Sequence, residues 1–290
     1  MYNNFLLKIY RKTEKIAGYK WSVENPRMVI CLIHGLAEYA GRYERVATAF
    51  NEKGIAMVSM DLRGHGISSG KPDHAAPRND ILQDIDALVE YAKENWPGVP
   101  IAMYGHSLGG NLTLDYRARG TYNHHVACYI VSAPWLLLYK DMPVPVVHFV
   151  KLLAKIKPSL HLASGIDEKQ LGNPQHVQGY SKDPLVGDGI SALTAIEAYE
   201  IGKQLAHGTY QKETDRAKAV PMLLMHGTAD TICSIEGSRL YAARDDQNCE
   251  FIQWQEYCHE IHNGGQNANG DEVIKTMVKY LERQLQNLEK

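Results

Sequence analysis

The chain has 290 residues, of which 44% are hydrophobic, and this is enough for one large domain with a sizeable core. Its 31 basic and 33 acidic residues give a net charge of -2, so it lacks the basic excess that a nucleic-acid partner requires. Five cysteines, an odd number without tight spacing and without a C-x-x-C pair, argue against a disulfide framework and a structural zinc site.

The first ten residues carry a short apolar stretch that precedes their basic residues, which is not the pattern of a signal peptide. No run approaches the roughly 18 to 20 consecutive apolar residues that a membrane-spanning helix needs. We therefore expect a soluble, cytoplasmic protein with free thiols, and the sequence leaves its oligomeric state open.

Short apolar runs alternate with amphipathic stretches along most of the chain. Strands are expected at residues 5–9, 20–23, 28–33, 55–60, 101–104, 127–132, 221–225 and 250–254. Helices are expected at about 41–53, at 81–96 with Asn79 or Asp80 as the cap, at 108–119 and at 271–288. This alternation predicts an α/β fold with a mostly parallel central sheet, opened by an antiparallel pair and covered by helices on both faces.

Residues 135–216 interrupt this alternation. They contain prolines, several helix-like pieces and no clear strand, and they lie between two strands of the expected sheet. We interpret them as a helical cap inserted over the carboxyl edge of the sheet, where folds of this class keep their sites. Residues 1–134 and 217–290 then form the predicted core.

The sequence Gly105-His106-Ser107-Leu108-Gly109 directly follows a predicted strand and opens a predicted helix. A serine at such a turn is held in a strained backbone conformation with its hydroxyl above the sheet. The pattern alone arises by chance in roughly one chain in ten of this length at average composition. Its position between strand and helix favours a chemical interpretation, an activated serine that attacks a carbonyl carbon.

Two downstream residues complete the order Ser, Asp, His that a catalytic triad has in this kind of fold. His259 lies shortly after the last strand and is predicted to be the general base, with His262 as the competing candidate. Asp230 follows the penultimate strand and is predicted to orient the imidazole, whereas Asp245 and Asp246 lie in a polar connection and are poorer candidates. If the pKa of the imidazole is unperturbed, activity should fall near or below pH ~6.5.

The oxyanion of the tetrahedral intermediate needs two N–H donors. Leu108 follows the serine and begins a helix, so its N–H is the first candidate. The loop after an early strand supplies the second, and we predict the N–H of Leu36. The segment 61–66 (DLRGHG) also carries polar groups, and we interpret it as a tight loop held by local hydrogen bonds.

Five segments carry motifs that belong together: residues 34–43 (HGLAEYAGRY), 61–70 (DLRGHGISSG), 105–110 (GHSLGG), 226–230 (HGTAD) and 259–263 (HEIHN). In combination they resemble the monoacylglycerol lipase and lysophospholipase group of serine α/β-hydrolases, over nearly the whole chain. The resemblance implies an α/β-hydrolase fold and esterase chemistry on a single-chain lipid. It implies Ser107, Asp230 and His259 as the catalytic triad, with no metal or organic cofactor.

The resemblance also implies a polar pocket for the alcohol leaving group, formed by Glu38, Arg42 and His262. Two positions depart from the family pattern. Tyr39 stands where a histidine is usual, at the polar end of this pocket. Leu108 stands where a methionine is usual, which changes a side chain but keeps the backbone donor.

Within the cap, residues 146–156 place apolar side chains around a stripe of His148, Lys151 and Lys155. A cationic amphipathic helix of this kind can rest transiently on an anionic membrane surface and admit a lipid. It can equally be a cap helix that packs on the domain and leaves its lysines in solvent. The sequence keeps both interpretations open.

The sequence therefore predicts a serine carboxylester hydrolase that cleaves monoacylglycerol to fatty acid and glycerol through an acyl-enzyme at Ser107, with an apolar tunnel in the cap. A lysophospholipase or a short-chain carboxylesterase would use the same machinery. An aminopeptidase is less favoured, because no acidic cluster in the cap is clearly placed to hold a substrate ammonium. The presence of all three triad residues disfavours a non-catalytic hydrolase-like binding protein.

Overall fold

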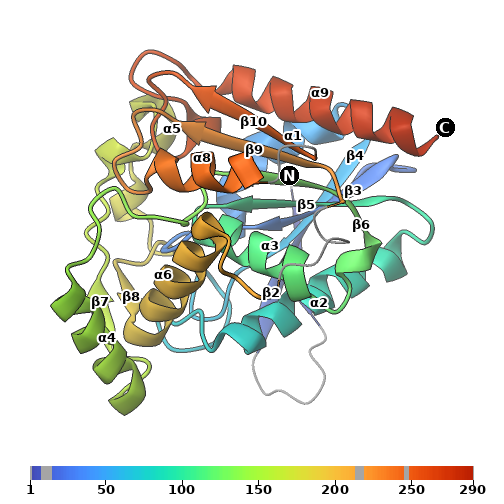
Figure 1. The fold of residues 1–290 in the computed structure, drawn as a ribbon. Coiled ribbons are helices and arrows are strands. Elements are labelled where there is room, and N and C mark those ends of the chain that lie inside the picture. Colours follow the sequence, from blue (N-terminus) through green and yellow to red (C-terminus); the bar gives the residue numbers. More distant parts are fainter. Residues whose placement is uncertain (1, 8–14, 213–218, 245–247, 290) are drawn as a thin grey trace.

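An eight-stranded sheet organises the structure, a computed structural model that describes residues 2–7, 15–212, 219–244 and 248–289. The strands are β1 (Asn3–Leu7), β2 (Ile16–Trp21), β3 (Met28–Ile33), β4 (Ile55–Met60), β5 (Ile101–His106), β6 (Val126–Ser132), β9 (Met222–Gly227) and β10 (Cys249–Trp254). Their order is β1-β2-β4-β3-β5-β6-β9-β10. The pairs β1–β2 and β2–β4 are antiparallel and the others are parallel, which confirms a mostly parallel sheet that opens with an antiparallel pair (Figure 1). The second strand, expected at 20–23, instead lies at Ile16–Trp21, and residues 8–9 of the strand expected at 5–9 lie outside the described residues.

Helices cover both faces of this sheet, as predicted. One face packs against α1 (Glu44–Asn51) and α9 (Asp271–Leu288), and the other against α2 (Arg78–Asn95), α3 (Leu108–Arg119) and α8 (Ile235–Arg244) (Figure 1). Strand β3 shows why its sequence, MVICLI, is apolar throughout. Its successive residues alternate between the two hydrophobic cores and all are fully buried, as in a parallel strand covered on both sides.

The segment between β6 and β9 adds a layer of its own. In chain order it contains α4 (Val144–Ile156), β7 (His161–Ala163), η3 (Glu168–Gln170), α5 (Pro174–Val177), η4 (Tyr180–Lys182), β8 (Gly189–Ser191) and α6 (Ala192–His207). Strands β7 and β8 form a small antiparallel sheet, which the sequence analysis missed because three residues are too few to show a strand period. The predicted cap boundary at 216–217 lies outside the described residues.

Several element boundaries differ from the predicted ones. The helix expected at 41–53 is divided into a 3-10 turn, η1 (Ala40–Tyr43), and α1. Helix α2 begins at Arg78, and its cap is Pro77 rather than Asn79 or Asp80. Proline has an extended backbone here and cannot donate to a preceding turn, so the helix starts directly after it, while Asp80 lies in the first turn near the positive end of the helix dipole.

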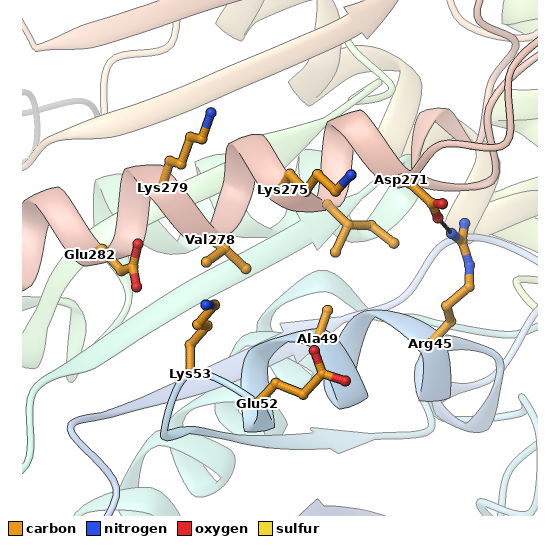
Figure 2. A pocket seen from close by; sticks show the side chains of 10 residues that line it. Arg45, Ala49, Glu52, Lys53, Asp271, Lys275, Val278, Lys279 and Glu282 are labelled. Atoms are coloured by element: carbon orange, nitrogen blue, oxygen red, sulfur yellow. Dashed lines mark hydrogen bonds and ion pairs between the residues drawn. The ribbon is translucent and has the colours of Figure 1, made fainter.

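A groove of about 430 Å³ lies between α1 and α9 (Figure 2). Its lining comes from α1, the turn that follows α1, and α9, and the ion pair between Arg45 and Asp271 (2.6 Å) lies at its edge. These residues are not among those predicted to carry the chemistry. The groove is therefore a surface feature separate from the predicted site.

None of the helices in the described part of the chain is both long enough and apolar enough to traverse a bilayer. Two short 3-10 turns lie beside strands of the sheet: η2 (Asn123–His125) precedes β6, and η5 (Ile261–Asn263) follows β10. The second of these turns lies in the loop that carries His259.

Candidate active site

Ser107 directly follows β5, has a φ of +54° and a ψ of -117°, and serves as the N-cap of α3. The surrounding backbone holds this conformation with three hydrogen bonds. The N–H of Ser107 donates to the carbonyl of Ser132 (3.0 Å), and its own carbonyl accepts from the N–H groups of Asn111 and Trp135 (3.0 Å each). A strained residue is maintained only where its neighbours fix it in this way, and such residues concentrate at functional sites.

The two glycines of the motif are required by close packing around this turn. A Cβ at Gly109 would lie 2.0 Å from the carbonyl oxygen of Ile33 and 2.4 Å from that of His34, which are backbone atoms of the neighbouring strand. A Cβ at Gly105 would lie 2.2 Å from Oγ1 of Thr113. The spacing G-x-S-x-G therefore allows α3 to approach β3 and β5 closely while it presents Ser107.

Ser107, His259 and Asp230 form a continuous chain of hydrogen bonds. His259 Nε2 lies 2.8 Å from Ser107 Oγ, and His259 Nδ1 lies 2.7 Å from Asp230 Oδ2. An ionised carboxylate only accepts, so Nδ1 carries the proton and donates it to Asp230. In the neutral imidazole Nε2 is then the acceptor and receives the hydrogen bond of the Ser107 hydroxyl. His259, rather than His262, occupies the position of a base for Ser107.

Asp230 is held in its ionised form by four donors. Its Oδ1 accepts from the N–H groups of Ile232 (2.8 Å) and Cys233 (3.0 Å), and its Oδ2 lies 3.0 Å from Nε2 of His226 in addition to its contact with His259. Burial by itself raises the pKa of the Asp230 carboxyl, but the two imidazoles and their hydrogen bonds bring it well below its ordinary value. The sequence analysis missed His226, whose place directly before Gly227-Thr228 at the end of β9 was the available signal.

The pKa of His259 is raised above its ordinary value. Burial lowers it, but the carboxylate of Asp230, its hydrogen bond, and the more distant carboxylates of Glu260 and Glu38 outweigh burial. The imidazolium that forms when His259 takes the serine proton is thus stabilised by its surroundings.

The raised pKa of His259 changes the pH dependence that we expect for the activity. A raised pKa means that His259 is protonated, and lost as a base, at a higher pH than an unperturbed imidazole. We therefore expect kcat/KM to fall as the pH decreases through a value above 6.5, the ordinary pKa of histidine, rather than near or below it. A pH profile of kcat/KM measured with a neutral ester checks this, and a rate that stays constant well below pH 6.5 would contradict it.

The two predicted oxyanion donors lie next to Ser107. Leu108 is the first residue of α3, and the N–H groups of a first helical turn have no acceptor within the helix. On the other side, a Cβ at Gly35 would lie only 3.1 Å from Ser107 Cβ, so the peptide leading to Leu36 passes directly beside the serine. The N–H groups of Leu36 and Leu108 as oxyanion donors remain a prediction.

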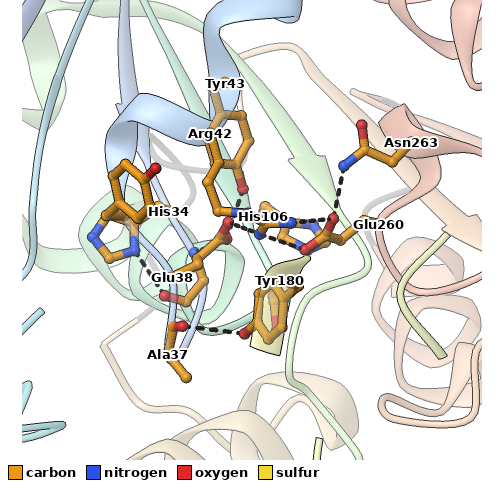
Figure 3. A network of polar contacts seen from close by, with 12 residues as sticks. His34, Ala37, Glu38, Arg42, Tyr43, His106, Tyr180, Glu260 and Asn263 are labelled. Atoms are coloured by element: carbon orange, nitrogen blue, oxygen red, sulfur yellow. Dashed lines mark hydrogen bonds and ion pairs between the residues drawn. The ribbon is translucent and has the colours of Figure 1, made fainter. Parts of the chain in front are cut away.

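Glu38 and Arg42 are brought together in a buried network beside the site (Figure 3). Arg42 Nη1 donates to Glu38 Oε2 (2.6 Å) and to Glu260 Oε1 (2.6 Å), and the guanidinium lies 4.6 Å from the ring centroid of Tyr180 in the cap. The sequence analysis missed Glu260, although a buried acid next to His259 is a natural partner for Arg42. The network joins the loop of Leu36, the loop of His259 and the cap.

His262 lies near that network and is packed against aromatic rings. It stacks on Tyr43, with ring centroids 5.0 Å apart, and meets His106 edge-on at 5.3 Å. Its Nδ1 lies 3.5 Å from the hydroxyl of Tyr104. Burial lowers the pKa of His262 to about 3, so the imidazole is neutral. The structure therefore does not join His262 to Glu38 and Arg42 by hydrogen bonds.

The segment 61–66 has a structural role, as inferred, but two of the three hydrogen bonds of the Asp61 carboxylate are long-range rather than local. The carboxylate of Asp61 accepts from the hydroxyl of Tyr19 and from the N–H groups of Ala40 and Ile67, each at 2.9 Å. These bonds connect β2, the loop of Leu36 and the turn after β4.

Among the described residues, Asp73, His161 and Asp188 form a cluster whose ligand atoms all lie within 4.8 Å of one another. His161 Nδ1 is 3.5 Å from Asp73 Oδ2 and Nε2 is 3.2 Å from Asp188 Oδ1, so the cluster is an imidazole that lies between two carboxylates. It does not involve Ser107, Asp230 or His259.

Comparisons with known proteins show the family of this chain. The profile of the family described as serine aminopeptidase, S33 matches residues 24–266. The monoacylglycerol lipase of Mycolicibacterium smegmatis is 29% identical over 260 residues, which are 89% of this chain and 90% of that protein. The monoglyceride lipase of Saccharomyces cerevisiae is 27% identical over 242 residues, which are 77% of this chain and 76% of that one.

A solved structure is similar over almost the whole chain. The crystal structure of the Paleococcus ferrophilus monoacylglycerol lipase has 30% sequence identity and a TM-score of 0.81, covering 93% of this chain and 99% of that one. This confirms the α/β-hydrolase fold and the predicted resemblance to the monoacylglycerol lipase group. The chain belongs to the serine aminopeptidase S33 family of α/β-hydrolases.

Proposed function

We propose that this protein is a serine carboxylester hydrolase that cleaves monoacylglycerol to fatty acid and glycerol, with Ser107, His259 and Asp230 as its catalytic triad. The observation that carries the proposal is the hydrogen-bonded chain from Ser107 Oγ through the His259 imidazole to Asp230. Proton removal by the neutral Nε2 makes the serine oxygen a nucleophile, and Asp230 stabilises the imidazolium that results.

The reaction proceeds in two halves. Ser107 Oγ attacks the ester carbonyl, and the N–H groups of Leu36 and Leu108 stabilise the negative charge on the carbonyl oxygen. His259 then returns the proton to the leaving alcohol, which leaves an acyl-enzyme on Ser107. Water deprotonated by His259 attacks this ester, and the fatty acid is released.

Glycerol as the leaving alcohol is supported by the relatives, whose names describe monoacylglycerol or monoglyceride lipases. Glu38, Arg42 and His262 are proposed as the polar end of the alcohol pocket. Lysophospholipase and short-chain carboxylesterase activities remain the alternatives, because they need the same triad. The family description mentions an aminopeptidase, and an assay with an aminoacyl amide distinguishes that activity.

A hydrolysis panel tests the proposal. We expect a higher kcat/KM for monoacylglycerols than for lysophosphatidylcholine, diacylglycerol, short nitrophenyl esters or an aminoacyl-nitroanilide. A preference for lysophosphatidylcholine or the aminoacyl amide would contradict the substrate assignment but leave the triad in place. Failure of a fluorophosphonate probe to label the protein would contradict the serine mechanism and favour a binding protein.

We also propose that α4 makes transient contact with a membrane surface when lipid substrate enters. Its side chains Phe149, Leu152 and Ile156 are 60%, 52% and 72% exposed, whereas Val150 is buried beneath the helix. Lys151 pairs with Glu200 of α6, so this lysine points along the cap rather than outward as part of a cationic stripe. The outer surface of α4 therefore presents these apolar side chains together with the exposed His148 and Lys155.

The serine variants of Phe149 and Leu152 test this contact. Each substitution removes an exposed apolar side chain, and burial of such a side chain in the membrane interface is worth about 1.5–3 kcal/mol, so vesicle binding should weaken about tenfold or more. Co-sedimentation with anionic vesicles measures this. Leu240→Ser on α8, which also replaces an exposed leucine, is the matched control and should bind as the wild type does. Equal binding by all variants would contradict a role for α4.

A cytoplasmic site of action is part of the same proposal. The five cysteines, all in the described part of the chain, form no disulfide, as expected for a protein in a reducing compartment.

A further inference from the structure

Glu260 directly follows the proposed base His259, and its buried carboxylate is turned toward Arg42 (Figure 3). Oε1 accepts from Nη1 at 2.6 Å and Oε2 from Nη2 at 2.9 Å, which is the bidentate geometry of a strong guanidinium–carboxylate pair. Asn263 Nδ2 donates to the same carboxylate at 2.7 Å. Burial raises the pKa of Glu260, but the charge and hydrogen bonds of Arg42 outweigh burial and bring it well below its ordinary value.

Arg42 carries this contact onward to the other half of the site. It donates to Glu38 Oε2, and Glu38 Oε1 accepts from the N–H of Gly35 (2.6 Å) and the hydroxyl of Tyr43 (2.9 Å). Gly35 immediately precedes Leu36, whose N–H is the proposed oxyanion donor. The pair of Arg42 and Glu260 thus ties the loop of the base to the loop of the oxyanion donor, although 218 positions separate the two residues in sequence.

The His259 loop is also attached to the core by Arg45, which donates to the carbonyl of His262 and to Asn263 Oδ1 (3.2 Å), and to the cap by two backbone hydrogen bonds. The N–H of His259 donates to the carbonyl of Gln170 (3.2 Å), and the N–H of Glu260 donates to the carbonyl of Leu171 (2.6 Å). The cap is the part of the molecule that must admit a substrate. His259 itself is held on the core side by Asp230, and the contact of Glu260 with Arg42 adds a second core attachment directly beside the base.

We propose that Glu260 is a positioning residue, which keeps His259 in register with Ser107 and the oxyanion loop through its ion pair with Arg42. The inference rests on the proposed function of the triad. A buried ion pair is often no more stabilising than apolar groups of the same volume, so a role in geometry accounts for this one better than a contribution to folding.

Glu260 also contributes to the charge around His259. The groups that face His259 are the carboxylates of Asp230, Glu260 and Glu38, and the imidazoles of His106 and His262. The carboxylates raise the pKa of His259, whereas burial lowers the pKa of both neighbouring imidazoles and keeps them neutral. Removal of the Glu260 charge should therefore lower the pKa of His259, whereas a shorter side chain that keeps the charge should leave this pKa unchanged.

Two variants distinguish the effect of the Glu260 side-chain length from the effect of its charge. Glu260→Gln removes the charge and weakens the bidentate pair, and Glu260→Asp keeps the charge but shortens the side chain. Glu256→Gln, an exposed residue of the same loop, is the matched control. The readouts are kcat and KM for p-nitrophenyl butyrate across pH, calculated per active site titrated with a fluorophosphonate, so that unfolded protein is not counted.

We expect kcat to fall about 10- to 100-fold in both Glu260 variants with little change in KM, the effect of a misplaced catalytic group. The acid limb of the pH profile should move to lower pH in Glu260→Gln and stay in place in Glu260→Asp. The control should match the wild type in rate and pH profile.

Unchanged kcat per titrated site in both variants would overturn the inference, and so would a loss confined to KM, which would indicate contact with the leaving group. If Glu260→Gln does not fold, Glu260→Asp decides by the same criteria. A wild type that neither reacts with the probe nor hydrolyses the ester overturns the proposed function and this inference together. An active wild type with unaffected Glu260 variants overturns the inference alone.

Discussion

Replacement of Ser107 by alanine is expected to reduce ester hydrolysis about 10⁶-fold and to abolish labelling by a fluorophosphonate. The variant loses the oxygen that forms the acyl-enzyme, while His259 and Asp230 keep their hydrogen bond. Residual turnover would come from substrate binding and the oxyanion donors alone. The measurement is the kcat for a monoacylglycerol together with the intensity of the probe-labelled band.

Ser181→Ala, at an exposed serine of the cap, is the control for this experiment and should retain both hydrolysis and labelling. Thermal unfolding of each variant shows whether the fold is intact, since Ser107 is the strained N-cap of α3 and its replacement could alter stability. Labelling of the Ser107→Ala protein at the wild-type rate would mean that another residue is the nucleophile.

Replacement of Asp230 by asparagine is expected to lower kcat about 10⁴-fold, as an Asp-to-Asn change does in other triads of this kind. In the wild type the Asp230 carboxylate accepts a hydrogen bond from His259 Nδ1, and this fixes the tautomer in which Nε2 receives the serine proton. An asparagine amide offers a donor to the imidazole as well as an acceptor, so the opposite tautomer can form and Nε2 then carries a proton. The measurement is kcat for the preferred ester at a pH above the acid limb.

Asp188→Asn removes a carboxylate that is almost fully exposed in the cap, and as the control it should leave kcat unchanged. The Asp230 variant should also react more slowly with the fluorophosphonate, because the serine is less activated. A kcat within about tenfold of the wild type would be far from the expected loss and would show that Asp230 does not orient the base.

The parts of the fold that sequence reasoning reached are those governed by local rules. The run MVICLI predicts a strand covered on both faces because each of its residues has an apolar side chain. Helix α9 was predicted with its observed bounds because its apolar residues repeat at helical spacing. Strands β7 and β8 were missed, because a strand of three residues shows no periodicity in sequence. The start of α2 was predicted three residues too late, because the cap is Pro77 and not Asn79 or Asp80.

The candidate site likewise contains residues that local sequence identifies and contacts that only folding brings about. The turn at Gly105–Gly109 is recognisable from five consecutive residues, because the close approach of Ile33 and Thr113 leaves no room for side chains there. The ion pair of Arg42 and Glu260 and the contact of His226 with Asp230 are not specified by any one segment of the sequence. Each depends on the folding of separate segments against one another.

By itself the sequence determined the order of strands and helices and the residue types for acyl transfer, because backbone sterics and hydrophobic periodicity act between near neighbours in the chain. Only the tertiary structure decided that His259 rather than His262 meets Ser107, that Lys151 turns toward Glu200, and that the pKa of His259 is raised rather than ordinary. Hydrogen bonds and charge interactions depend on distances of a few ångströms, and between distant segments those distances exist only once the chain has folded.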